Sequence, residues 1–180
     1  MTTYTNGAFD RDANYVPITL NGFQTKYSAT LSANNTTASI ALFSLTGAVE
    51  VLSLYGIVTT ALSSNVTAAY WQLNDQTATP DISLATGTTL SSFQVGSIMT
   101  RRSLVSVAMT GINASAGFVQ DPVAATAPGV FMPFNIVQKT GGILTTVDFV
   151  YTTTNTPASG VIDFYIGWIP LTETSSITSM

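Results

Sequence analysis

Short runs in which apolar and polar residues alternate make up much of the chain, and they are rich in Val, Ile, Thr and aromatic residues. A period of two is typical of antiparallel β-strands that cover a core on one face. The clearest runs are residues 142–154 and 160–171, and Val147, Phe149 and Tyr151 share one face of the first. Because only a short connection separates them, we predict that these two runs pair as a hairpin.

Residues 39–75 form a second β-rich region, in which Glu50 is the only charged residue before Asp75. Turn signals divide it into three runs. Because the region is so apolar, we expect its strands to lie in a sheet that is buried on one face and largely buried on the other. Gly56 lies inside the middle run, which is therefore either one long bent strand or two strands. We expect this region to form one half of a sandwich whose other half is the 142–171 hairpin, and burial of Glu50 in a subunit interface would favour an assembly.

Glycine, proline and asparagine divide the rest of the chain into shorter pieces. Residues 74–96 are expected to be a long loop with a short strand at 81–84 and one helical turn near 90–93. A second loop is expected at residues 118–129, which hold two prolines, and a hairpin-type turn at residues 139–142. The last ten residues are polar and are expected to be loose.

About eight to ten strands and no amphipathic helix result from this division, which predicts an all-β fold. The predicted architecture is an antiparallel two-sheet sandwich, with a jelly roll as the favoured form at this length. An immunoglobulin-like sandwich comes second because it needs about seven strands. The predicted domains are an extended N-terminal arm at 1–26, the sandwich at 27–172 and a polar tail at 173–180.

The predicted arm has poor periodicity and four widely spaced aromatic residues. A partly ordered terminus is the plainer interpretation. Aromatic side chains are also frequent anchors in protein interfaces, so the arm is expected to contact a neighbouring subunit. These expected anchors are Tyr4, Phe9, Tyr15 and Phe23.

Composition favours a chain that works inside an assembly. Charged residues make up 8% of the sequence, whereas 30 Thr and 18 Ser supply its polarity. Since charge is the usual protection against association, a packed subunit is favoured over a solvated Thr/Ser-rich sandwich. The net charge of −4 and the absence of any basic cluster beyond Arg101-Arg102 argue against nucleic-acid binding. That Arg pair either binds an acidic groove on a partner or consists of one exposed Arg and one paired with a loop Asp.

Reaction chemistry is scarce in this sequence. It has no His and no Cys, which excludes Ser-His and Cys-His nucleophilic systems, so neither an enzyme nor a cofactor is expected. Asp75 and Asp81 have the chemistry of a glycosidase pair, and with Asn74 that of a Ca²⁺ site, although solvated loop acids are the plainer interpretation. Trp71 and Trp168 either stack on sugars or belong to the core or an interface.

No run is apolar for long enough to cross a membrane, and the first residues lack the features of a signal peptide, so synthesis in a cytoplasm is expected. The strings GAVEVLSLYGIVTTALSSNVTAAYWQLND, TGTTLSS and GSIM then resemble small β-rich structural proteins of tailed bacteriophages, especially head decoration (cement) proteins. That resemblance implies a non-enzymatic homotrimer at threefold or quasi-threefold positions on the capsid exterior, bound to the major capsid protein. Alternatives are a tail, fibre or baseplate subunit, or a carbohydrate-binding module that uses Trp71 or Trp168.

Overall fold

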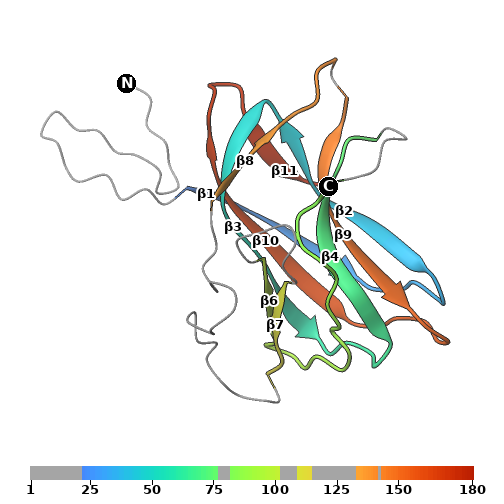
Figure 1. Cartoon of the computed structure of the whole chain (residues 1–180). Coiled ribbons are helices and arrows are strands. Elements are labelled where there is room, and N and C mark those ends of the chain that lie inside the picture. The colour runs from blue at the N-terminus through green and yellow to red at the C-terminus, as the bar shows by residue number, and fades with distance from the viewer. Residues whose placement is uncertain (1–21, 77–81, 102–108, 115–132, 142) are drawn as a thin grey trace, which may run out of the picture.

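The computed structural model describes residues 22–76, 82–101, 109–114, 133–141 and 143–180 (Figure 1). Every regular element among them is a strand, and no helix in this part of the chain is long and apolar enough to cross a membrane. The strands are β1 (Phe23–Thr30), β2 (Thr37–Thr46), β3 (Ala48–Thr60), β4 (Val66–Asn74), β5 (Ile82–Ser83), β6 (Ile98–Thr100), β7 (Thr110–Ile112), β8 (Phe134–Val137), β9 (Thr145–Thr153), β10 (Val161–Pro170) and β11 (Ser176–Ser179).

Two antiparallel sheets pack face to face, which confirms the predicted all-β sandwich. One sheet has the order β1-β10-β3-β6-β7, and β8 also pairs with β3; the other has the order β11-β2-β9-β4-β5. Figure 1 shows β1, β3 and β10 in one layer and β2, β4 and β9 in the other. The chain passes from one sheet to the other at most of its connections, so sequence neighbours are seldom partners in a ladder.

The predicted C-terminal hairpin is wrong. β9 pairs with β2 and β4 in one sheet, whereas β10 pairs with β1 and β3 in the other. Both are central strands with a partner along each edge, and almost every residue of β9 is buried. The turn after β8 likewise leads to the opposite sheet and closes no hairpin. Alternation identified the core-facing residues correctly but carried no information about which strand lies alongside.

Residues 39–75 do not form one half of the sandwich either. β2 and β4 belong to the five-stranded sheet, whereas β3 belongs to the six-stranded sheet. β3 is a single strand that continues through Gly56, and its register against β10 shifts elsewhere, beside Gly167 and beside Val161. A Cβ at Gly56 would lie 3.0–3.1 Å from side chains of Ile162, Phe164 and Met99, so close packing explains this glycine.

Aromatic rings from both sheets meet in the core. Trp71 of β4 is fully buried and contacts the Phe164 ring of β10 edge to face, with centroids 6.4 Å apart. Phe149 of β9 lies 4.7 Å from the same Phe164 ring. Edge-to-face and tilted contacts of this kind stabilise beyond the burial of their area, by about 0.5–1.5 kcal/mol each.

The ends of the sandwich differ from the expected boundaries. β1 starts at Phe23, inside the region expected to be an arm, and pairs with β10 along its whole length. The polar tail expected to be loose forms β11 and pairs with the end of β2. Residues 90–93 form a turn without a helix, in which the Phe93 amide donates to the Leu90 carbonyl.

Candidate functional site

Several residues singled out from the sequence lie outside the described residues. They are Tyr4, Phe9, Tyr15, Asp81 and Arg102. Of the expected arm anchors, only Phe23 is described, and it lies in β1. Its ring stacks on Trp168 with centroids 4.9 Å apart, so it packs within its own sandwich.

Both tryptophans are buried, so of the two roles weighed for them the core role fits their environment and sugar stacking does not. Trp71 sits in the centre of the core. Trp168 is covered by Phe23 on one side, and its Nε1 donates to Thr25 Oγ1 at 3.1 Å. Stacking on a sugar needs an open ring face, and neither indole offers one.

Arg101 is also buried and joins the two sheets. Its Nε donates to the Leu84 carbonyl at 2.9 Å, and its guanidinium carbon lies 4.1 Å from the centroid of the Phe134 ring. Leu84 follows a strand of the five-stranded sheet, whereas Arg101 and Phe134 belong to the other side of the sandwich. Desolvation by burial lowers the pKa of Arg101. Arg101 therefore connects the two sheets, and of the roles weighed for it, docking into an acidic groove on a partner does not fit its burial.

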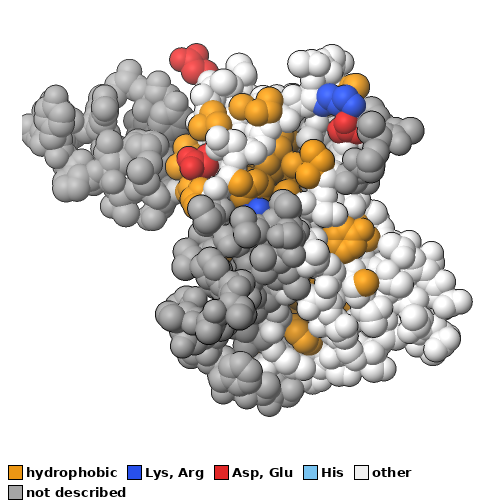
Figure 2. All heavy atoms as spheres, viewed as in Figure 1, with side chains coloured by type: hydrophobic (Ala, Val, Ile, Leu, Met, Phe, Trp, Pro, Cys, Tyr) orange, Lys and Arg blue, Asp and Glu red, His pale blue; other side chains and the backbone are white. Residues whose placement is uncertain are grey.

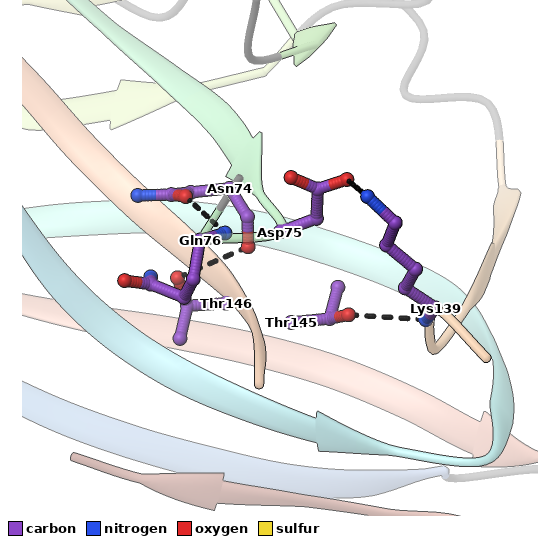
Figure 3. Close-up of polar contacts among 6 residues, drawn as sticks. All are labelled: Asn74, Asp75, Gln76, Lys139, Thr145 and Thr146. Atoms are coloured by element: carbon purple, nitrogen blue, oxygen red, sulfur yellow. Dashed lines mark hydrogen bonds and ion pairs between the residues drawn. The ribbon is translucent and has the colours of Figure 1, made fainter. Parts of the chain in front are cut away.

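In the loop that was weighed as a Ca²⁺ site, Asn74 and Asp75 both have partners within the chain (Figure 3). Asp75 forms an ion pair with Lys139 at 2.5 Å, and the Lys139 amide donates to Thr145 Oγ1. Asn74 Oδ1 accepts from the Gln76 amide at 2.8 Å. Among the described residues no three acidic side chains lie close enough together to hold a metal ion, and Asp81 lies outside them.

The outer face of the six-stranded sheet carries the most organised cluster of partly exposed functional groups in the described chain. Lys26, Tyr165, Tyr55 and Thr100 are register partners in one row across β1, β10, β3 and β6. The two tyrosine rings stack with centroids 5.0 Å apart and an angle of 13°. Lys26 Nζ lies 5.7 Å from the Tyr165 centroid on the side away from β3. We call this row, with Gln24 and Asp163, the cross-strand face.

Gly167 shapes this face by having no side chain. It stands between Gln24 on β1 and Ser53 on β3, and a Cβ there would lie 2.5 Å from Ser53 Oγ. The Gln24 side chain crosses this gap and donates from Nε2 to the Tyr55 hydroxyl at 3.0 Å. A glycine in a central strand therefore allows a contact between two strands that are not neighbours.

An ion pair holds the other side of the row. Lys26 and Asp163 are 2.6 Å apart, with half of the Lys26 side chain exposed. The hydrogen bond from Lys26, helped by one from Ser28, lowers the pKa of Asp163, and the same ion pair raises the pKa of Lys26. The pair is neutral as a whole, so the face presents tyrosine hydroxyls and ring edges without net charge.

This geometry suits a protein partner better than a sugar. The ring spacing of 5.0 Å matches the ~4.8 Å distance between neighbouring strands, so the rings stand upright side by side. The Tyr55–Tyr165 contact covers one face of each ring, and Lys26 approaches the other face of Tyr165. Rigid tyrosines held by neighbours are the groups that dominate many protein interfaces.

The sequence placed Tyr55 and Tyr165 on strands but did not indicate that they meet. Tyr165 stands opposite the core-facing Phe164 in the alternating pattern, which marks it as outward-facing. Bringing it beside Tyr55 requires the pairing of β3 with β10, two strands about a hundred residues apart. Comparison of the sequence with protein families and curated proteins, and of the fold with solved structures, gave no match.

Proposed function

We propose that this chain is a non-enzymatic structural subunit of a phage virion: a decoration protein that binds the major capsid protein on the outer surface of the head. The observation that carries the proposal is the cross-strand face, a neutral surface built on the stacked pair Tyr55–Tyr165. It lies on a chain in which only 8% of the residues are charged. A polar but uncharged contact surface avoids the cost of burying charges on the shell.

The proposal includes a homotrimer and the jelly-roll form of the sandwich. A trimer at a threefold position contacts several capsid subunits at once, so individually weak contacts add up through multivalency. A closed ring of copies also covers surface that so little charge would leave prone to association. The jelly-roll form is supported by the frequent passage of the chain between the two sheets.

Co-sedimentation tests the attachment. Shells assembled from the major capsid protein of the same genome are mixed with the purified chain, and the bound amount is measured against concentration. Replacing Tyr55 and Tyr165 together with Ala is expected to weaken binding at least tenfold, since truncated interface tyrosines commonly cost more than about 1 kcal/mol each. Tyr70→Ala is the matched control, because Tyr70 is a partly buried tyrosine on the other sheet.

Two results would overturn the proposal. Unchanged occupancy of the double variant, with its circular dichroism spectrum intact, would remove the cross-strand face from the attachment. Absence of the wild-type chain from heads but presence on isolated tails would assign it to the tail. Mass measurement of the purified chain tests the trimer separately.

A further inference from the structure

A second surface on the same sheet is apolar, and we call it the apolar end. It lies on the outer side of β8, β3 and β10 where these strands end together, and Figure 2 shows hydrophobic side chains gathered over β3 and β8. Its members are Ala48, Leu52, Val137, Ile169 and Leu171, with Glu50 and Asn135 among them.

The pairing of strands explains why these side chains lie together. Val137 is the register partner of Ala48, and the Leu171 amide donates to the Ala48 carbonyl at 2.9 Å. The next row toward the middle of the sheet brings Glu50 beside Ile169. Val137 is 68% exposed and Leu171 is 48% exposed, and both lie beside Ala48, so two exposed branched aliphatic side chains flank the start of β3.

The described N-terminal part of the chain begins against this surface. A Cβ at Gly22 would lie 2.8 Å from Leu52 Cδ1 and 2.5 Å from the Trp168 carbonyl oxygen, so the backbone passes directly beside a member of the apolar end. Phe23 is in register with Trp168 and β1 runs antiparallel to β10, so the N-terminal end of β1 lies at the same end of the sheet as Leu171.

The residues that precede Gly22 have the matching chemistry. Residues 15–20 read YVPITL, in which five of the six side chains are apolar and none is charged. Pro17 lacks an amide hydrogen, so this run is poorly suited to extend the ladder of β1 and better suited to lie across a face. Six extended residues span about 20 Å, whereas three neighbouring strands span only about 10 Å.

We propose that residues 15–20 pack over the apolar end of their own copy. Because the run is tethered at Gly22, its effective concentration at the surface is far higher than that of any other apolar segment. This arrangement covers Val137 and Leu171 before any assembly forms. Tyr15 would then pack on its own copy, whereas the sequence led us to expect a contact with a neighbouring subunit. The proposal is independent of capsid attachment.

A single-cysteine experiment tests this directly, because the natural chain contains no Cys. Val137→Cys is introduced into the full chain, and its rate of modification by a maleimide is measured. The same rate is measured after Val16, Ile18 and Leu20 are all changed to Ser. The control is Ile82→Cys, since Ile82 is 63% exposed on the other sheet.

The cysteine at position 137 is expected to react at least tenfold more slowly in the full chain than in the triple-Ser chain. The cysteine at position 82 is expected to react equally fast in both. Dilution by a hundredfold should leave the protection unchanged, because the covering segment belongs to the same copy. Equal rates at position 137 would overturn the proposal. Protection that disappears on dilution would also overturn it, since a second copy would then supply the cover.

Discussion

Replacing Tyr151 with Phe removes one hydroxyl group, and the structure allows the cost to be worked out. Tyr151 is buried on β9, and its hydroxyl oxygen accepts hydrogen bonds from the backbone amides of Ser32 and Ala33, each at 3.1 Å. Those two residues connect β1 to β2 and so join the two sheets. Each hydrogen bond contributes about 0.5–1.5 kcal/mol net, so the free energy of unfolding should fall by about 1–3 kcal/mol.

Urea denaturation followed by fluorescence measures this change, with an unchanged slope showing that the same surface unfolds. At about 2–4 °C per kcal/mol for a chain of this size, the melting temperature should fall by roughly 2–12 °C. Tyr27→Phe is the control, because the Tyr27 hydroxyl has no hydrogen bond within the described part of the chain. Hydrogen exchange at Ser32 and Ala33 should accelerate in Tyr151→Phe alone. A loss of unfolding free energy below about 0.5 kcal/mol, equal to that of the control, would refute the view that this hydroxyl stabilises the connection between the two sheets.

Three further outcomes follow from other contacts. Asp148 is buried and accepts hydrogen bonds from Ser39, Asn74 and Thr146. Asp148→Ala should therefore lower the free energy of unfolding in urea by about 2–4 kcal/mol, and Asp148→Asn by clearly less. Equal losses in the two variants would contradict this account. The lowered pKa of Asp163 means that its stabilisation is complete above its ordinary value of 3.8 and is lost as the pH falls through the lower folded value. Asp163→Asn should therefore reduce the loss of thermal stability in acid, by a small amount because Lys26 is exposed. Ala68 has a φ of 46°, so Ala68→Gly should raise stability by about 0.5–1 kcal/mol in calorimetry. Unchanged or lower stability would contradict backbone strain at this position.

Local patterning was enough to predict the fold class and much of the core. Val147, Phe149 and Tyr151 share the inward face of β9 because alternation depends only on neighbours in sequence. The partners of each strand could not be obtained this way. A short connection between β9 and β10 favoured a hairpin, yet the chain crosses there to the other sheet, and alternation carries no information about which sheet a strand joins. The polar tail was misjudged for the opposite reason, since an edge strand such as β11 needs few apolar residues.

The candidate site was harder to predict because it depends on register. Nothing local indicates that Lys26, Tyr165 and Tyr55 form one row, and an empty position at Gly167 matters only once Gln24 is known to lie beside it. The sequence left open whether Arg101 binds an acidic groove on a partner, is exposed, or pairs with a loop Asp. Arg101 contacts Leu84 and Phe134, and these contacts join segments distant in sequence, which no local pattern indicates.

The two outer faces of the sandwich carry few charges and differ in their uncharged polar groups. This difference makes one of them better suited to docking than the other. On the five-stranded sheet, hydroxyls satisfy one another across strands: Thr37 bonds Thr152 at 2.8 Å, and Ser44 bonds Thr178 at 2.7 Å. A partner would gain little there, because it would have to break those bonds to make its own. The six-stranded sheet instead presents Tyr55 and its neighbours, whose apolar area is still available for burial. Docking through that sheet therefore costs fewer existing contacts and removes more apolar surface from water.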